Sequence, residues 1–224
     1  MNAVGDLKHV ALAVWATAWM GAVGAYLFSV AADQVPGCFP HLAGCASVSA
    51  AGRLGWGYFV FKAMMLPSAA FAMIYWLICF HWLRLMGGGV TAIDRAIVVL
   101  GITGAIFLVL YATFLGSSGD TYRLMRRYGT VVYFGFTYLA QLLLSYRARS
   151  LGITSPIVSW KVGLGLGMLI GGLILAVLIN FVEDDDHLEN ISEWNFATAL
   201  TFYPVLTWLL WRQTGFRVRF ELGD

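Results

Sequence analysis

The residues able to carry acid–base or nucleophilic chemistry lie beside the apolar segments of the chain. Ser49 belongs to a polar segment over 32–56, His187 follows an acidic run, and Glu193 opens the last apolar segment. A serine hydroxyl becomes a nucleophile when a base lies within reach, and histidine and glutamate are both suitable bases. We therefore name Ser49, Glu193 and His187 as candidates for proton handling in nucleophilic catalysis. The alternative is structural, because loop hydroxyls often cap helices and a first-turn carboxylate complements the helix dipole.

Basic side chains form a second group. Lys62 falls inside the second apolar segment, where a charge is costly unless it reaches the interface, pairs or lines a polar cavity. Snorkelling to the interface is one explanation. The other is an anionic headgroup site, because ammonium and guanidinium groups suit a phosphate. In that hypothesis Glu193 orients or pairs with Lys62. The headgroup-binding candidates are Lys62, Arg53, Arg126, Arg127 and Ser47.

Cysteine and histidine usage bears on redox and metal chemistry. Cys38 and Cys45 share the polar segment, and on an oxidising side of a membrane they would close a disulfide that tethers it. Two reduced thiols in a flexible loop are the alternative. His41 and His187 are too few for a three-histidine site, and neither Cys-x-x-Cys nor His-Glu-x-x-His occurs. The acidic run over 183–186 lacks the spacing of a calcium loop. We predict no metal and no cofactor.

The elements that position these residues follow from composition. Of 224 residues, 60% are hydrophobic and 12% charged, and mean hydropathy is +0.76, whereas soluble domains carry about 45–50% apolar and about 25% charged residues. The net charge of +2 offers no basic surface for nucleic acid. We predict one all-α domain over 1–224, a bundle of six transmembrane helices. The predicted spans are 9–31, 57–83, 92–115, 128–146, 162–182 and 192–211.

The basic residues predict the orientation of these spans. If both termini are cytoplasmic, the inner loops and ends carry nine Lys or Arg residues and the outer segments carry five, of the 14 in the chain. The excess on the inner side favours this topology, although the cluster over 123–127 lies on the outer side. We therefore predict an integral membrane protein with cytoplasmic termini. A bacterial inner membrane and a eukaryotic endomembrane, in the Golgi or the endoplasmic reticulum, both remain open.

Several short motifs, in order along the chain, resemble one family of membrane proteins. They are Ser47-Val48-Ser49-Ala50-Ala51-Gly52, Phe59-Val60-Phe61-Lys62, Tyr75-Trp76, Leu115-Gly116-Ser117-Ser118-Gly119-Asp120 and Glu193-Trp194. Over about residues 10–216 the chain resembles the six-span Frag/DRAM/Sfk family, closest to its post-GPI-attachment-to-proteins factor two branch. The resemblance implies lipid handling at the outer or lumenal leaflet. The chain departs from it at Arg126-Arg127, where family members often carry a histidine.

The leading hypothesis is therefore a membrane protein that handles lipid. We expect it to bind a phospholipid, a lyso-phospholipid or a GPI-type lipid at its outer end and to support acyl-chain remodelling. The alternative is a non-enzymatic membrane organiser that recruits a partner membrane protein or modulates lipid distribution. Gly163, Gly167 and Gly171, spaced by four on the fifth span, favour that alternative because they would let a neighbouring helix approach closely.

Overall fold

The computed structural model describes residues 6–182 and 186–218, and every regular element in these two ranges is a helix. This confirms the all-α prediction. The helices are η1 (Leu7–His9), α1 (Val10–Ala31), α2 (Pro40–Ala43), α3 (Val48–Ala51), α4 (Gly55–Gly87), α5 (Ala92–Phe114), α6 (Asp120–Ser150), α7 (Pro156–Leu178) and α8 (Asp186–Gln213). Of the acidic run over 183–186, residues 183–185 lie outside the described residues.

Four of the helical segments in the described ranges are long and apolar enough to cross a membrane. They are Leu7–Ala31, Gly55–Gly87, Ala92–Phe114 and Pro156–Leu178. α6 and α8 are also long, with 31 and 28 residues, but they are more polar. These four segments suggest an integral membrane protein.

The two more polar helices begin before the predicted spans. α6 begins at Asp120 and α8 at Asp186, whereas the apolar segments begin at 128 and 192. Hydropathy marks only the apolar part of a helix, while backbone hydrogen bonding continues into polar sequence. At the start of α6, Asp120 and Arg123 form an exposed ion pair at 2.9 Å, three residues apart on the helix.

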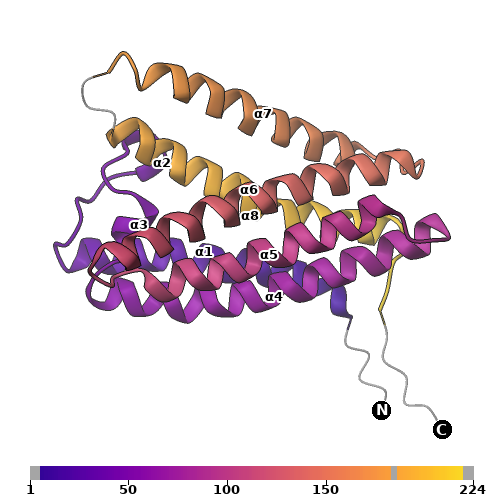
Figure 1. Cartoon of the computed structure of the whole chain (residues 1–224), viewed down its shortest axis with the longest axis horizontal. Helices are drawn as coiled ribbons and strands as arrows, with labels where there is room; N and C mark the ends of the chain where they lie inside the picture. The colour runs from indigo at the N-terminus through magenta and orange to yellow at the C-terminus, as the bar shows by residue number, and fades with distance from the viewer. Residues whose placement is uncertain (1–5, 183–185, 219–224) are drawn as a thin grey trace, which may run out of the picture.

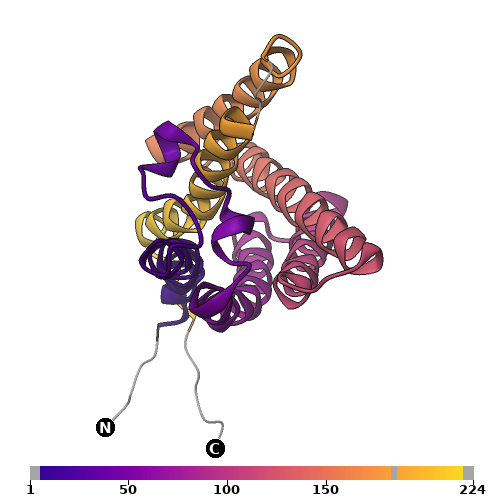
Figure 2. The same cartoon turned by 90° about the vertical axis from the view of Figure 1, so that its left-hand side faces the viewer.

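The long helices run side by side between two ends of the bundle (Figure 1). One end carries α2 and α3, and we call it the outer end. The start of α1 and the finish of α8 lie together at the opposite, inner end, where the rings of His9 and Trp208 are 6.1 Å apart. α1 packs against α4, α5 lies between α4 and α6, and α8 lies beside α1. Viewed from the outer end, α7 lies at the periphery (Figure 2).

The buried core has an inner and an outer part. Trp76, Trp82 and Trp211 fill the inner part, and smaller residues make room for them. At Gly101 on α5, a Cβ atom would lie 2.2 Å from the ring of Trp76, so only glycine fits there. In the outer part, the buried side chains of Phe61, Tyr111 and Trp194 come from three different helices. This outer part supports the polar cluster described below.

A buried lysine fastens the inner end of α7 to the bundle. Lys161 is only 1% exposed, and its Nζ donates to Gln141 Oε1 at 3.1 Å and to Thr207 Oγ1 at 2.7 Å. The hydroxyl of Tyr203 donates to the Lys161 carbonyl at 3.0 Å. α6, α7 and α8 are thus joined by hydrogen bonds at one level.

The glycines spaced by four on α7 do not hold a neighbouring backbone. A Cβ atom at Gly163 or Gly167 would meet nothing within 4 Å. Gly165 instead faces the bundle, where a Cβ atom would lie 2.6 Å from Leu142 and 2.8 Å from the Tyr203 hydroxyl. Gly163 and Gly167 therefore take no part in close helix packing among the described residues, because this side of α7 points away from the bundle.

Candidate functional site

A serine, a glutamate and a tyrosine meet at the outer end of the bundle. The Ser49 backbone nitrogen donates to Glu193 Oε1 at 3.2 Å, and its hydroxyl donates to the same oxygen at 3.3 Å. The Ser49 Oγ also lies 2.9 Å from the hydroxyl of Tyr111. The three residues come from α3, α8 and α5. Two of the residues predicted to handle protons, Ser49 and Glu193, are therefore in direct contact.

The short helix α3 is held in position by its own cap and by α8. Ser47 precedes α3, and its Oγ accepts a hydrogen bond from the Ala50 nitrogen at 2.9 Å. The indole nitrogen of Trp194 donates to the Ala46 carbonyl at 2.9 Å. Because Trp194 directly follows Glu193, one turn of α8 holds the chain at both Ala46 and Ser49, on either side of the cap.

The remainder of the 32–56 segment is tethered over the same end. Cys38 and Cys45 form a disulfide, with Cα atoms 6.3 Å apart. Beneath it, the Tyr26 hydroxyl accepts a hydrogen bond from the Cys38 nitrogen at 2.7 Å and donates to the Cys38 carbonyl at 2.9 Å. Asn190 of α8 donates to the carbonyl of Gly44, whose φ of 58° suits glycine. The segment is therefore an ordered cover over α8.

A narrow cavity lies below the polar cluster. It has a volume of about 50 Å³, and its walls are largely apolar side chains of α1, α4, α5, α6 and α8. Glu193 and Tyr111 contribute to its lining, together with Tyr133, Phe134 and Thr198. Apolar walls with a few polar groups are typical of small-molecule sites, although such sites are larger, at about 300–1,000 Å³. The cavity therefore places the polar cluster beside an apolar space with room for only a few atoms.

The histidine in this region is His41 on α2, which we did not predict for proton handling. Its Nε2 lies 3.0 Å from Thr198 Oγ1, a lining residue of the cavity, and its ring lies 5.4 Å from that of Trp194. Its Nδ1 is buried, with no hydrogen-bond partner among the described residues. Burial lowers the pKa of His41. In the sequence His41 was one of two histidines predicted on the outer side. Only its place between Cys38 and Cys45 hinted that it lies near the cavity.

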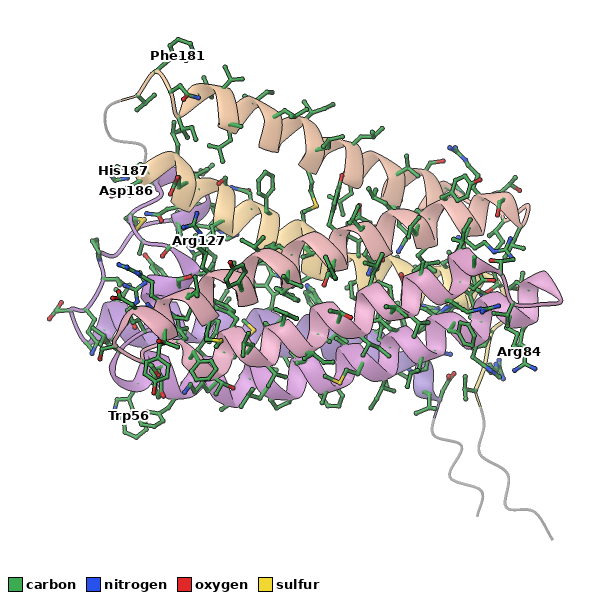
Figure 3. The ribbon with its side chains drawn as sticks, viewed as in Figure 1. Trp56, Arg84, Arg127, Phe181, Asp186 and His187 are labelled. Carbon is green, nitrogen blue, oxygen red and sulfur yellow. A yellow bond between two sulfur atoms is a disulfide. The ribbon has the colours of Figure 1, made fainter. Side chains whose placement is uncertain are left out.

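His187, the predicted base, lies at the outer rim instead. It is exposed at the start of α8, and its Nδ1 lies 3.1 Å from the Ala43 carbonyl (Figure 3). It lies six residues before Glu193 on the same helix, so the two positions are about 9 Å apart along the axis. The structure therefore brings His187 to the covering segment and not to the Ser49–Glu193 contact.

Lys62 does not pair with Glu193, which corrects that expectation. Its ammonium donates to the hydroxyl of Tyr58, one turn earlier on α4, and lies 4.1 Å from the centre of the Tyr58 ring. Among the described residues, no ion pair joins Lys62 to Glu193. Lys62 therefore points back along its own helix towards the outer end, as a snorkelling lysine does.

The predicted headgroup arginines differ in their surroundings. Arg53 is exposed in the turn after α3, and its charge acts on both Glu193 and Tyr111. Arg126 donates to the carbonyls of Ser117 at 2.5 Å and Phe114 at 3.4 Å, so it satisfies the end of α5. Arg127 is exposed on α6 near the outer end (Figure 3). Arg53 is the arginine whose charge reaches the Ser49–Glu193 contact.

In the described part of the chain, no three His, Cys, Asp or Glu side chains come together as metal ligands. Comparison with models of protein families, with curated proteins and with solved structures finds no match to this chain. The functional argument therefore depends on the geometry of the site.

Proposed function

We propose that this chain is a six-span membrane protein that binds a lipid at its outer end and supports acyl-chain remodelling. The lipid is a phospholipid, a lyso-phospholipid or a GPI-type lipid. The observation that carries the proposal is the contact of Ser49 with both Glu193 and Tyr111 at the top of a narrow apolar cavity. In this proposal the cavity gives the polar cluster apolar surroundings, and the cluster faces the ester or headgroup of the lipid.

The proposed topology places both termini in the cytoplasm. In support, six long helices run between the two ends of the bundle, and the start of α1 lies beside the finish of α8 (Figure 1). The disulfide of Cys38 and Cys45 then lies at the outer or lumenal face, where such bonds persist. α6 and α8 also cross the membrane in this proposal, because their charged residues lie towards the two ends of each helix.

The proposal includes the Frag/DRAM/Sfk resemblance. Its motif over 47–52 supplies Ser49, and its Glu193-Trp194 motif supplies the carboxylate that contacts Ser49. Two motifs far apart in the sequence thus contribute to one polar cluster. The proposed headgroup contacts come from Arg53, with Lys62 and Arg127 at the same end of the bundle. Guanidinium groups at this depth suit a lipid phosphate.

The proposed reaction is acyl transfer through Ser49. As the Ser49 Oγ bonds to the ester carbonyl carbon, its proton passes to Glu193. The bond from that carbon to the lipid oxygen breaks, and the departing oxygen takes the proton from Glu193. The products are acylated Ser49 and a lyso-lipid, and the reverse steps with a second lyso-lipid restore Ser49. The Tyr111 hydroxyl, 2.9 Å from Ser49 Oγ, donates to the developing oxyanion.

The test is exchange of a labelled acyl chain between phospholipid and lyso-phospholipid by the purified protein in nanodiscs. We expect Ser49→Ala and Glu193→Gln each to lower exchange by about 10²-fold or more, because each removes a group that moves the proton. Ser118→Ala, in the exposed turn before α6, is the matched control and should exchange like the wild type. Equal exchange by wild type, Ser49→Ala and Glu193→Gln would refute the proposed site.

A second candidate function is supported by the exposure of α7. Only 11% of its most apolar stretch is buried inside the chain, the lowest share among the four candidate spans. An apolar helix that its own bundle leaves uncovered can pack against a partner membrane protein. This organiser function predicts a stoichiometric partner after purification in mild detergent, whereas a self-contained remodelling enzyme is purified alone. A partner lost on replacing Leu166 or Leu173 by Ala would favour the organiser.

A further inference from the structure

The helix α7 separates from α6 towards its outer half. Its inner end is fastened through Lys161 to α6 and α8, and from there the ribbon diverges from α6 (Figures 1 and 2). It stays beside α8, where a Cβ atom at Gly171 would lie 3.5 Å from the ring of Phe196. Large apolar side chains of the outer half of α7 are exposed, including Leu169, Ile170, Leu173, Ile174 and Val177.

An apolar groove of about 300 Å³ lies between α6, α7 and α8. Two glycines open it, Gly135 on α6 and Gly172 on α7, and the ring of Phe196 on α8 contributes to the wall. A Cβ atom at Gly135 would meet nothing within 4 Å. The Tyr138 hydroxyl in this wall donates to the Gly165 carbonyl at 2.8 Å, so it is already bonded within the protein. The groove therefore suits an apolar occupant.

The groove borders the candidate site. Phe134 of α6 lines both the groove and the cavity that reaches Glu193. Phe196 lies three residues after Glu193, within one turn of α8. Phe134 is thus a common wall of the lateral groove and of the cavity beneath the Ser49–Glu193 contact.

The size of the groove determines which occupant fits. The groove measures about 300 Å³, and a helix with its side chains is about 10 Å across, so a partner helix could cover the groove but could not enter it. An acyl chain is thin enough to lie in the groove and has no polar group to satisfy along its length. The inner cavity, at about 50 Å³, is too small to take the tail as well.

We propose that the groove between α6, α7 and α8 holds one acyl chain of an outer-leaflet lipid, with Phe134 as the wall between this chain and the cavity beneath Ser49 and Glu193. The inference rests on the proposed function, and it adds the side of the bundle on which the chain lies. The lipid then needs no passage through the covering segment over 32–56. Its headgroup stays at the outer end while its tail lies between the helices.

The experiment uses full-length protein in phosphatidylcholine nanodiscs that contain a phosphatidylcholine with a diazirine within one acyl chain. After illumination, mass spectrometry locates the labelled residues. We expect labels on the groove residues Phe134, Met168 and Phe196 in the wild type. In Gly172→Leu, labelling of Phe134 should fall at least about fivefold. The leucine side chain fills part of the groove, and the closely packed walls leave no other space for the acyl chain.

Gly167→Leu is the matched control. It adds the same side chain to the same helix at a position with nothing within 4 Å, outside the groove. Its labelling of Phe134 should equal that of the wild type. Gly172→Leu should fold, because its Cβ atom lies at an ordinary 3.8 Å from Phe196, and its melting temperature is measured beside that of Gly167→Leu. Equal Phe134 labelling in both variants overturns the proposal, as does labelling confined to the outward residues of α7.

Glu193→Gln separates this inference from the proposed function. If the groove holds an acyl chain but the exchange reaction does not occur, Phe134 is labelled in both Glu193→Gln and the wild type, while no sample exchanges acyl chains. That outcome supports the groove and refutes the reaction. If the occupant is instead a helix, cross-linking joins α7 to another protein and Phe134 carries no lipid label, which overturns the inference.

Discussion

Ser49 and Glu193, 144 residues apart in the sequence, are joined by two hydrogen bonds to the same carboxylate oxygen. One donor is the Ser49 backbone nitrogen at 3.2 Å, and the other is its hydroxyl at 3.3 Å. The backbone contact fixes α3 against α8, while the side-chain contact sets the direction of the hydroxyl. One carboxylate therefore serves both the position of the covering segment and the proposed chemistry.

Tyr111→Phe tests the proposed chemistry while leaving both hydrogen bonds between Ser49 and Glu193 in place. The substitution removes the hydroxyl beside Ser49 Oγ but keeps the ring, whose centre lies 5.7 Å from that of Phe61. We expect acyl exchange to fall by about 10²-fold, as when one donor to an oxyanion is lost. The lipids retained on purification should be unchanged. Tyr122→Phe, on the exposed start of α6, is the control, and undiminished exchange in Tyr111→Phe would exclude its role as a donor.

Reduction of the disulfide should loosen the covering segment. Cys38 and Cys45 close a short loop, with a sequence separation of 7, and a loop of this size stabilises a fold by about 2–3 kcal/mol. Cys38→Ser with Cys45→Ser should therefore unfold at lower denaturant concentration. A reducing agent should shift the wild type in the same direction and leave the double variant unchanged. A wild-type midpoint that does not respond to reductant contradicts this prediction.

The buried ion pair of Asp94 and Arg147 should contribute more to stability than an exposed pair. Their atoms are 2.8 Å apart, and the Asp94 side chain is 1% exposed. Asp94→Asn should cost about 3–5 kcal/mol, because it leaves the half-buried Arg147 without its counter-charge. The pair of Asp120 and Arg123 is 93% and 75% exposed, so Asp120→Asn should cost under about 1 kcal/mol. Denaturant unfolding in detergent compares the two, and equal losses would refute the distinction.

The stability of the fold should depend on pH through His41. Burial lowers its pKa below the ordinary value of 6.5. In the unfolded chain the ring binds a proton at pH values where the folded ring stays neutral, so the free energy of unfolding decreases as pH falls through 6.5. The difference in melting temperature between about pH 7.5 and about pH 5.5 should therefore be smaller in His41→Gln than in the wild type. His187→Gln is the control, and an unchanged pH dependence in His41→Gln would contradict the prediction.

Sequence reasoning found part of the site because residue types carry part of the information. Ser49 and Glu193 were candidates since a hydroxyl and a carboxylate are unusual beside long apolar segments. Tyr111 was missed, because a tyrosine near the end of an apolar segment is ordinary. His187 was named because it was an available base on the outer side, but six residues on a helix separate it from Glu193 by more than a turn. Being on the same side of the predicted membrane was thus a poor guide to contact here.

The sequence by itself determined the helical class, the apolar segments and the polar cover between the first two of them. These properties are sums or patterns over neighbouring residues, and water and lipid act on them locally. Only the tertiary structure decided that Lys62 bonds to Tyr58 and not to Glu193, and that Gly165 rather than Gly163 or Gly167 faces the bundle. Such contacts depend on the rotation and path of whole helices. That rotation is set by the packing of many side chains at once, so no short motif specifies it.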